Sequence, residues 1–173
     1  LYAFYLCTSL TTIEVGAGNV NYTDVNGVLF NTDKTLLHTY PADKTGASYT
    51  IPDSVSSIGT SAFRECTRLS NITIPDSVTS IGYAAFRECT NLNSITIPEG
   101  VTSIGGWAFD DCYALRTVTI PDSVTSIGDG AFDECNRLNS ITIGNGVTSI
   151  GDWAFYCCND LNSITIPDSV TSI

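Results

Sequence analysis

The chain has 173 residues, of which 43% are hydrophobic and only 14% are charged. Its 18 acidic and 7 basic residues give a net charge of −11, which disfavours binding to nucleic acid or to anionic lipid. No apolar run approaches the ~20 residues of a membrane-spanning helix, so direct insertion into a membrane is not expected.

The first 50 residues are less regular than the rest. Residues 1–15 align with a later segment, because Phe4 and Cys7 precede Phe63 and Cys66 by the same interval, and we interpret them as a partial repeat. In the segment 16–50, two strand-like runs at 27–31 and 35–40 are joined by 32–34. This arrangement predicts a hairpin-bearing repeat, with the hairpin bulging from one turn of a coil.

Residues 51–173 form a regular array. The segment Ile51-Pro-Asp-Ser-Val55 returns every 23 residues without insertion or deletion. Its later copies begin at Ile74, Ile97, Ile120, Ile143 and Ile166. The whole chain is therefore predicted to be one solenoid domain, 1–173. It starts and stops within a unit, so we expect it to be a fragment of a longer array.

One unit contains several predicted elements. The segment Leu92-x-x-Ile95-x-Ile97 matches the core pattern of a leucine-rich repeat and predicts a short strand over 94–97, ended by Pro98. A second extended piece is expected over 101–104. Helix-like spacing, which predicts one or two helical or 3₁₀ turns, follows at Ala108, Phe109, Cys112 and Leu115.

The predicted fold class is a right-handed leucine-rich-repeat solenoid of about seven coils. A short parallel sheet would cover one face, and the helical or 3₁₀ turns the opposite face. One unit buries too little apolar surface to offset the entropy of ordering it, so the coils must stabilise one another. Equivalent phenylalanines should then form a continuous interior column: Phe63, Phe86, Phe109, Phe132 and Phe155.

The unit from Ile120 to Thr142 closely resembles the BspA-like leucine-rich repeat, and Gly27–Asn31 with Tyr40-Pro41 resembles the hairpin-bearing unit of that family. The resemblance covers essentially the whole chain. It implies a secreted or cell-surface protein of host-associated bacteria or parasitic protozoa, with roles in adhesion. No catalytic residues come with the motif, and fold alone does not specify function.

The cysteines follow the same period. Cys157 is the exception among the seven. The other six occupy one repeat position: Cys7, Cys66, Cys89, Cys112, Cys135 and Cys158. A disulfide framework is one alternative. Stacked equivalents lie ~4.8 Å apart, however, whereas disulfides favour Cβ separations of ~3.8 Å. We therefore interpret the row as a buried ladder of free thiols, and because these do not converge as zinc ligands do, no metal is expected.

An acidic row follows the strand-ending positions, interrupted by Asn145: Asp53, Asp76, Glu99, Asp122 and Asp168. We interpret it as turn chemistry rather than a calcium site. The single histidine, His38, has no neighbouring nucleophile motif, and there is no phosphate loop or dinucleotide fingerprint. We therefore expect neither an enzyme nor a cofactor.

Candidate partner-binding residues fall into two groups. The first is aromatic, at positions that vary between units, and its members could anchor an interface or pack on a neighbouring coil: Tyr83, Trp107, Tyr113, Trp153 and Tyr156. The second is a row of outward strand hydroxyls: Ser94, Thr96, Thr117, Thr119, Ser140 and Thr142. Threonine suits exposed strands, although such a row could also order water. Asn21 and Asn71 would accept glycans only in a eukaryotic secretory route.

These patterns favour a non-enzymatic adhesion or protein-binding scaffold, secreted or at the cell surface. Its partner would be a host matrix protein or another cell-surface protein. The alternative is a filament or lattice component formed by end-to-end self-association. A remote alternative is an ice-binding surface made by the hydroxyl row.

Overall fold

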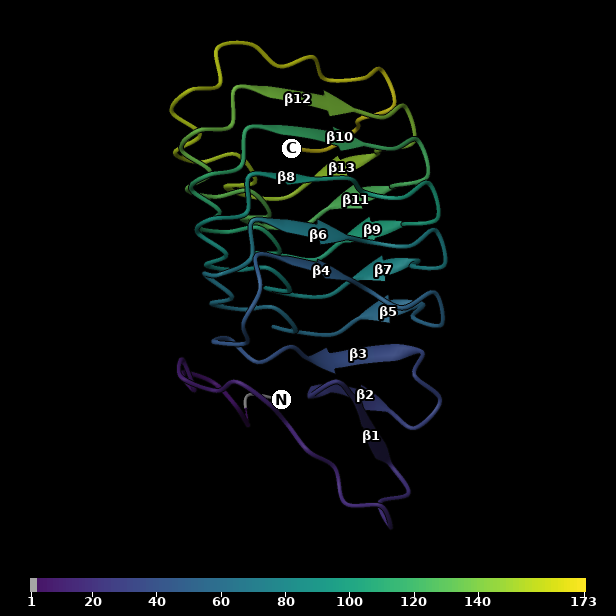
Figure 1. Cartoon of the computed structure of the whole chain (residues 1–173). Helices are drawn as coiled ribbons and strands as arrows, with labels where there is room; N and C mark the ends of the chain where they lie inside the picture. The colour runs from purple at the N-terminus through teal and green to yellow at the C-terminus, as the bar shows by residue number, and fades with distance from the viewer. Residues whose placement is uncertain (1–2) are drawn as a thin grey trace.

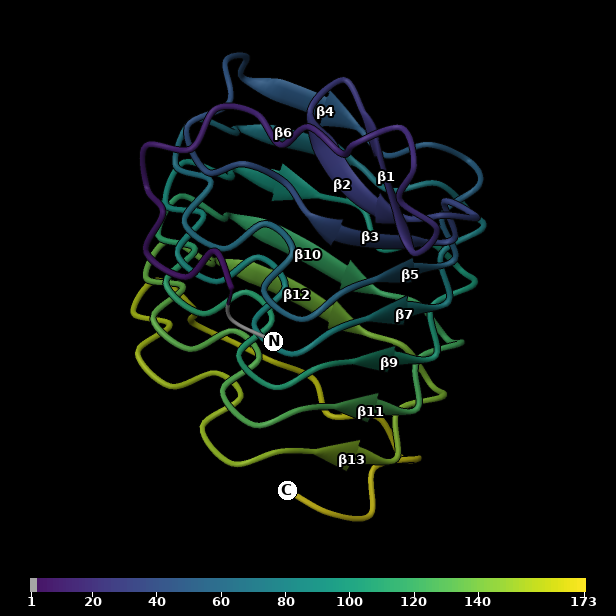
Figure 2. The ribbon, with the colours of Figure 1, turned by 90° about the horizontal axis from the view of Figure 1, so that it is seen from below.

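The chain winds into a stack of coils, seen from the side in the computed structural model of Figure 1. The structure describes residues 3–173, so the first two residues of the predicted partial repeat 1–15 lie outside the described part. The stack is a right-handed β-solenoid of about five turns. Fewer turns form than the expected seven, because residues 3–21 contribute no strand and the next strands form a hairpin. Each regular turn has two short strands and an irregular side (Figure 2).

The first sheet has eight strands in the order β1-β2-β3-β5-β7-β9-β11-β13. From β3 onward it is parallel, and each strand pairs with its equivalent in the next turn: Ser57 faces Ser80, which faces Ser103. These strands correspond to the predicted second extended piece. Their bounds are β5 Ser57–Ile58, β7 Ser80–Ile81, β9 Ser103–Ile104, β11 Ser126–Ile127 and β13 Ser149–Ile150.

The other strands form two further parallel sheets on another side of the coil, in the orders β4-β6-β8 and β10-β12. Parallel strands therefore occupy two sides of the coil, where one had been expected. The predicted strand over 94–97 is shorter in its own turn, Ser94–Ile95. The bounds are β4 Ser48–Thr50, β6 Asn71–Thr73, β8 Ser94–Ile95, β10 Thr117–Ile120 and β12 Ser140–Ile143.

The third side is made of turns, and the prediction of helical or 3₁₀ turns there was wrong: the described residues contain no helix, and therefore none that could cross a bilayer. Trp107 and Asp111 have positive φ angles of 57° and 59°, which a right-handed helix does not accommodate. The N–H groups of Trp107, Phe109 and Asp111 bond to carbonyls of the next turn instead. We call this side the turn face; in one unit it covers residues 105–115.

The N-terminal hairpin forms as predicted, with β2 (Val28–Asn31) antiparallel to β3 (Leu36–Thr39). It does not bulge from the coil, because β3 pairs in parallel with β5 and continues the first sheet. A further strand, β1 (Tyr22–Val25), pairs with β2 through a two-residue turn. That turn is Asn26-Gly27, and both residues have positive φ, as a type I′ hairpin turn requires.

The core consists of columns that run along the axis of the stack. The predicted phenylalanine column is confirmed: successive rings from Phe63 to Phe132 are stacked 5.1 Å apart, and Phe155 follows at 5.7 Å. Phe63 to Phe132 are fully buried. Tyr40 extends the column at the other end, 5.3 Å from Phe63. The hairpin unit is thus packed onto the regular array through the same column.

Candidate interaction surface

The predicted aromatic residues all lie on the turn face, and they differ in exposure. Tyr83 and Tyr113, in interior turns with coils on both sides, are 44% and 42% exposed, and Trp153 is 63% exposed. Tyr156 is also exposed. Trp107 is only partly exposed, because its ring lies where a side chain at Gly130 of the next turn would stand. Trp107 therefore packs on a neighbouring coil, whereas the other four aromatic side chains are exposed.

Local contacts hold this aromatic group. Trp107 and Trp153 share the positive-φ position of their units and their rings lie 6.3 Å apart. The Arg87 guanidinium lies 5.6 Å from the centre of the Trp107 ring, within the range of a cation–π contact. The Tyr83 ring lies beside Gly106 of the next turn, in van der Waals range of a Cβ atom built there. Gly130 thus makes room for the aromatic side chain of Trp107 in the previous turn.

The predicted hydroxyl residues lie elsewhere. Ser94, Thr117, Thr119, Ser140 and Thr142 are exposed on β8, β10 and β12, and Thr96 is exposed just beyond β8. The outer row is divided between two sheets, β4-β6-β8 and β10-β12. Because these strands and the turn face form different sides of the coil, the structure does not bring the two predicted groups into one site.

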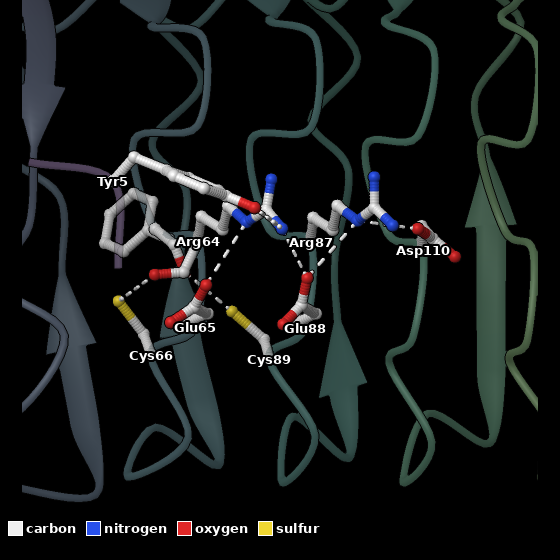
Figure 3. Close-up of polar contacts among 9 residues, drawn as sticks. Tyr5, Arg64, Glu65, Cys66, Arg87, Glu88, Cys89 and Asp110 are labelled. Carbon is white, nitrogen blue, oxygen red and sulfur yellow. Dashed lines mark hydrogen bonds and ion pairs between the residues drawn. The ribbon is translucent and has the colours of Figure 1, made fainter. Parts of the chain in front are cut away.

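A charged ladder, which was not predicted from the sequence, runs from turn to turn along the turn face (Figure 3). Arg64 donates a hydrogen bond to Glu88 of the next turn at 2.6 Å, and the Arg87 side chain lies 2.8 Å from a carboxylate oxygen of Asp110 in the turn after that. The Tyr5 ring stacks on the Arg64 guanidinium, with 4.5 Å between the ring centre and the Arg64 Cζ atom. The sequence did contain a signal for this ladder. The residue after the phenylalanine of the column is arginine in two units and aspartate in the next two.

Asp110 is the buried acid of this ladder, with 2% of its surface exposed. Burial raises the pKa of Asp110 to about 7, and the Arg87 charge opposes this change. The carboxylates of Glu88, Asp111 and Asp133 raise the pKa further. A carboxyl group that titrates near neutral pH is thus built into the scaffold.

The cysteine column has partners that were not predicted. The thiol of Cys89 donates to the carbonyl of Phe63 in the previous turn at 3.0 Å, and the same contact recurs at Cys112, Cys135 and Cys158. The seven cysteines are free. Four of the six in the predicted buried row are buried, whereas Cys7 is exposed and Cys158 is partly buried, because these two lie in the first and last turns. Burial raises the pKa of the Cys112 thiol well above its usual value. These thiols therefore act as small apolar groups that also satisfy a carbonyl in the neighbouring turn.

The remaining candidates have local roles. Asp122 of the acidic row accepts a hydrogen bond at 2.6 Å from the backbone N–H of Asn145 in the next turn, so it bonds a turn amide, although in a different coil. His38 is half-buried, 2.9 Å from the hydroxyl of Thr39 and in edge contact with Tyr22. Within residues 3–173, no three histidine, cysteine or acidic side chains gather in a way that could hold a metal ion.

The coil geometry defines the protein as a leucine-rich-repeat solenoid, a scaffold that exposes variable side chains over a repeated core. Residues 42–125 match the model of the BspA type leucine rich repeat region, with six copies, so this part of the chain belongs to that family. No curated protein sequence matches the chain.

Several solved bacterial structures are similar to it. A leucine-rich repeat protein from Eubacterium ventriosum is 33% identical over 97% of this chain and 52% of its own, with a TM-score of 0.77. The pneumococcal vaccine antigen PcpA is 27% identical over 95% of this chain and 45% of its own, with a TM-score of 0.80. A leucine rich cell surface protein from Faecalibacterium prausnitzii is 32% identical over 82% and 44%, with a TM-score of 0.67. The chain thus spans about half the length of these proteins or slightly less.

Proposed function

We propose that the chain is a non-enzymatic protein-binding scaffold of the bacterial cell surface, secreted and adhesive, whose partner is a host matrix protein or another surface protein. The observation that carries the proposal is the exposure of Tyr83 and Tyr113 in interior turns, 44% and 42%, above a fully buried column of phenylalanines. Neighbouring turns could have covered these rings, yet both remain exposed. Large aromatic side chains of this kind are the usual anchors of protein interfaces.

The rigidity of the support strengthens the proposal. The backbone of the turn face bonds to the next turn at alternate residues, so the Cα atoms that carry the aromatic side chains are held in fixed positions. A partner would therefore meet a preorganised surface and lose little entropy in ordering it. The names of the pneumococcal antigen and of the Faecalibacterium cell surface protein support a location at the cell surface.

The test is binding of the chain to an immobilised panel of extracellular-matrix and cell-surface proteins, measured by biolayer interferometry. We expect Tyr83→Ala and Tyr113→Ala each to weaken binding by about 2 kcal/mol, roughly 30-fold, if they are anchors. Thr142→Ala, on the strand side, is the matched control and should leave affinity within about twofold.

Two outcomes would contradict the proposal. One is that no protein of the panel binds the wild-type chain. The other is that Thr142→Ala abolishes binding while both tyrosine variants retain it, since the partner would then lie on the hydroxyl row. Melting temperatures of the variants should match the wild type, because the tyrosine side chains are exposed.

A further inference from the structure

A basic groove, distinct from the turn-face aromatic residues, lies next to the strands β6, β8 and β10. It is lined chiefly by Arg68, Asn91, Asn93, Ala114, Arg116 and Arg137. The whole chain has only 7 arginine and lysine residues against 18 acidic ones. Three of the 7 lie in this groove, so positive charge is concentrated there on an otherwise acidic molecule.

Two of these arginines have no acidic partner. In the described part of the chain, the ion pairs are formed by Arg64, Arg68 and Arg87. Arg68 binds Asp43, whereas Arg116 and Arg137 are exposed and form no ion pair. Each guanidinium group carries five N–H donors in a fork that fits a carboxylate or sulfate. Both groups are therefore available to an anion from solution.

The repeat sets the spacing of the charges. Arg116 and Arg137 lie in adjacent turns, and Arg68 lies two turns before Arg116, with Asn91 and Asn93 in the turn between. At about 4.8 Å per turn, the stripe from Arg68 to Arg137 is about 14 Å long. Asp160 follows Arg137 at the equivalent position of the next unit and ends the stripe. Arg68 is paired with Asp43, so the two unpaired charges lie in adjacent turns at one end of the groove, and the asparagines extend it beyond them. An extended ligand with anionic groups matches this arrangement better than a single small anion.

The uncharged lining indicates the kind of ligand. The Asn91 amide donates to the Thr67 carbonyl at 2.7 Å, which fixes the side chain and leaves its oxygen as an acceptor. Asn93 accepts from the Ser94 hydroxyl at 3.2 Å. Asparagine amides both donate to and accept from hydroxyl groups. The apolar side chains in the groove are alanines, so it offers no pocket for a large apolar side chain of a peptide.

We propose that this groove binds an anionic polysaccharide, with carboxylate or sulfate groups on Arg116 and Arg137 and sugar hydroxyls on the asparagines between the arginines. The groove lies where the edge of the turn face meets the strands β6, β8 and β10, so the proposal concerns different side chains and a different class of ligand from the protein-binding role of the exposed aromatic residues. Because the rest of the surface is acidic, the polyanion would be confined to the groove.

The experiment measures binding of the whole chain to heparin oligosaccharides and to oligogalacturonate by isothermal titration calorimetry at several salt concentrations. We expect the double variant Arg116→Gln/Arg137→Gln to weaken binding about tenfold or more and to reduce its salt dependence, since two charge contacts are lost. The control Lys34→Gln/Lys44→Gln changes the net charge equally and should alter affinity by less than about twofold. Circular dichroism and thermal melting confirm that all variants are folded.

The proposal is overturned if the wild-type chain binds neither saccharide at low salt. It is also overturned if both double variants weaken binding equally, because the saccharide would then be attracted to any positively charged side chain of the chain. If polyglutamate binds as tightly as either saccharide, the polysaccharide proposal is wrong and the ligand of the groove is an acidic peptide. Tyr83→Ala should leave saccharide binding unchanged, so this result is separable from the test of the protein-binding role.

Discussion

At the scale of single residues, Asp110 has the most consequential environment. Its carboxyl group is almost completely buried beside Arg87, and burial raises its pKa from 3.8 to about 7. The folded protein therefore holds a proton on Asp110 at pH values at which the unfolded chain has released it. The resulting stabilisation is fully present below about pH 4 and is lost as the pH rises through about 7.

This linkage can be measured with Asp110→Asn, whose amide does not titrate. We expect the unfolding free energy of the wild type, relative to that of the variant, to fall by more than about 1 kcal/mol between pH 4 and pH 8, since one pKa unit corresponds to about 1.4 kcal/mol. Urea unfolding at the two pH values provides the measurement. Subtracting the variant removes the titration of other groups, and a difference that does not change with pH would refute the assignment.

The exposed and buried aromatic positions show the limit of residue-level prediction. Trp107 and Trp153 occupy the same place in their units, and the sequence left open whether either was buried. Trp107 is covered because Gly130 in the next turn leaves space for its ring. Such coverage depends on the residue 23 positions later, so the repeat register must be known before exposure can be inferred.

At the scale of elements, a column of glycines allows the turns to approach closely. A Cβ atom built on Gly128 would lie 2.8 Å from the carbonyl carbon of Gly105 and closer still to the backbone of Gly106. Backbone atoms cannot move aside as a flexible side chain can. Gly82 and Gly105 face the backbone of the previous turn in the same way.

Gly128→Ala is therefore expected to lower the free energy of unfolding by about 1–3 kcal/mol, because the turns must separate to admit the methyl group. Gly16→Ala is the matched control, since nothing lies within 4 Å of the added Cβ, and its effect should be small. Chemical denaturation of both variants measures the difference. If both variants lose the same free energy of unfolding, the close approach of the turns is not the reason that glycine is required at Gly128.

The turn face also explains why one predicted element was wrong. The spacing of Ala108, Phe109, Cys112 and Leu115 suits a helix, and it equally suits consecutive turns closed by bonds such as Cys112 N–H to Phe109 O. Positive φ at Trp107 and Asp111 selects the second arrangement. Residues other than glycine rarely adopt that conformation, so the sequence alone carried little sign of it. The Asn26-Gly27 turn, by contrast, was a recognisable signal that was overlooked.

At the scale of the whole molecule, the 23-residue spacing predicted the stacking correctly. Every regular turn pairs in register with the next, as Ser126 does with Ser149, and the phenylalanines form one column. The number of parallel sheets and the charged ladder were not predicted, because both depend on how the corners of the coil turn. The boundaries of the hairpin-bearing unit at 16 and 50 remain a prediction.

The column leads to a prediction about position in the array. Phe109→Ala should cost about 3–5 kcal/mol, because the cavity interrupts contacts with rings on both sides. Phe155 is only partly buried, so Phe155→Ala should cost clearly less. Thermal unfolding followed by circular dichroism compares the two variants. A larger loss at Phe155 would show that stability is not transmitted through the column.

The hydrogen bonds between turns have a mechanical consequence. They occur on the strand sides and on the turn face, and they join each coil to the next along the axis of the stack. Tension applied along that axis would open them a few at a time, so the outermost coil would peel away while the others remain intact. Force applied across the axis would have to shear many of them together. A protein of this design anchored to a surface would yield gradually in one direction and resist strongly in the other.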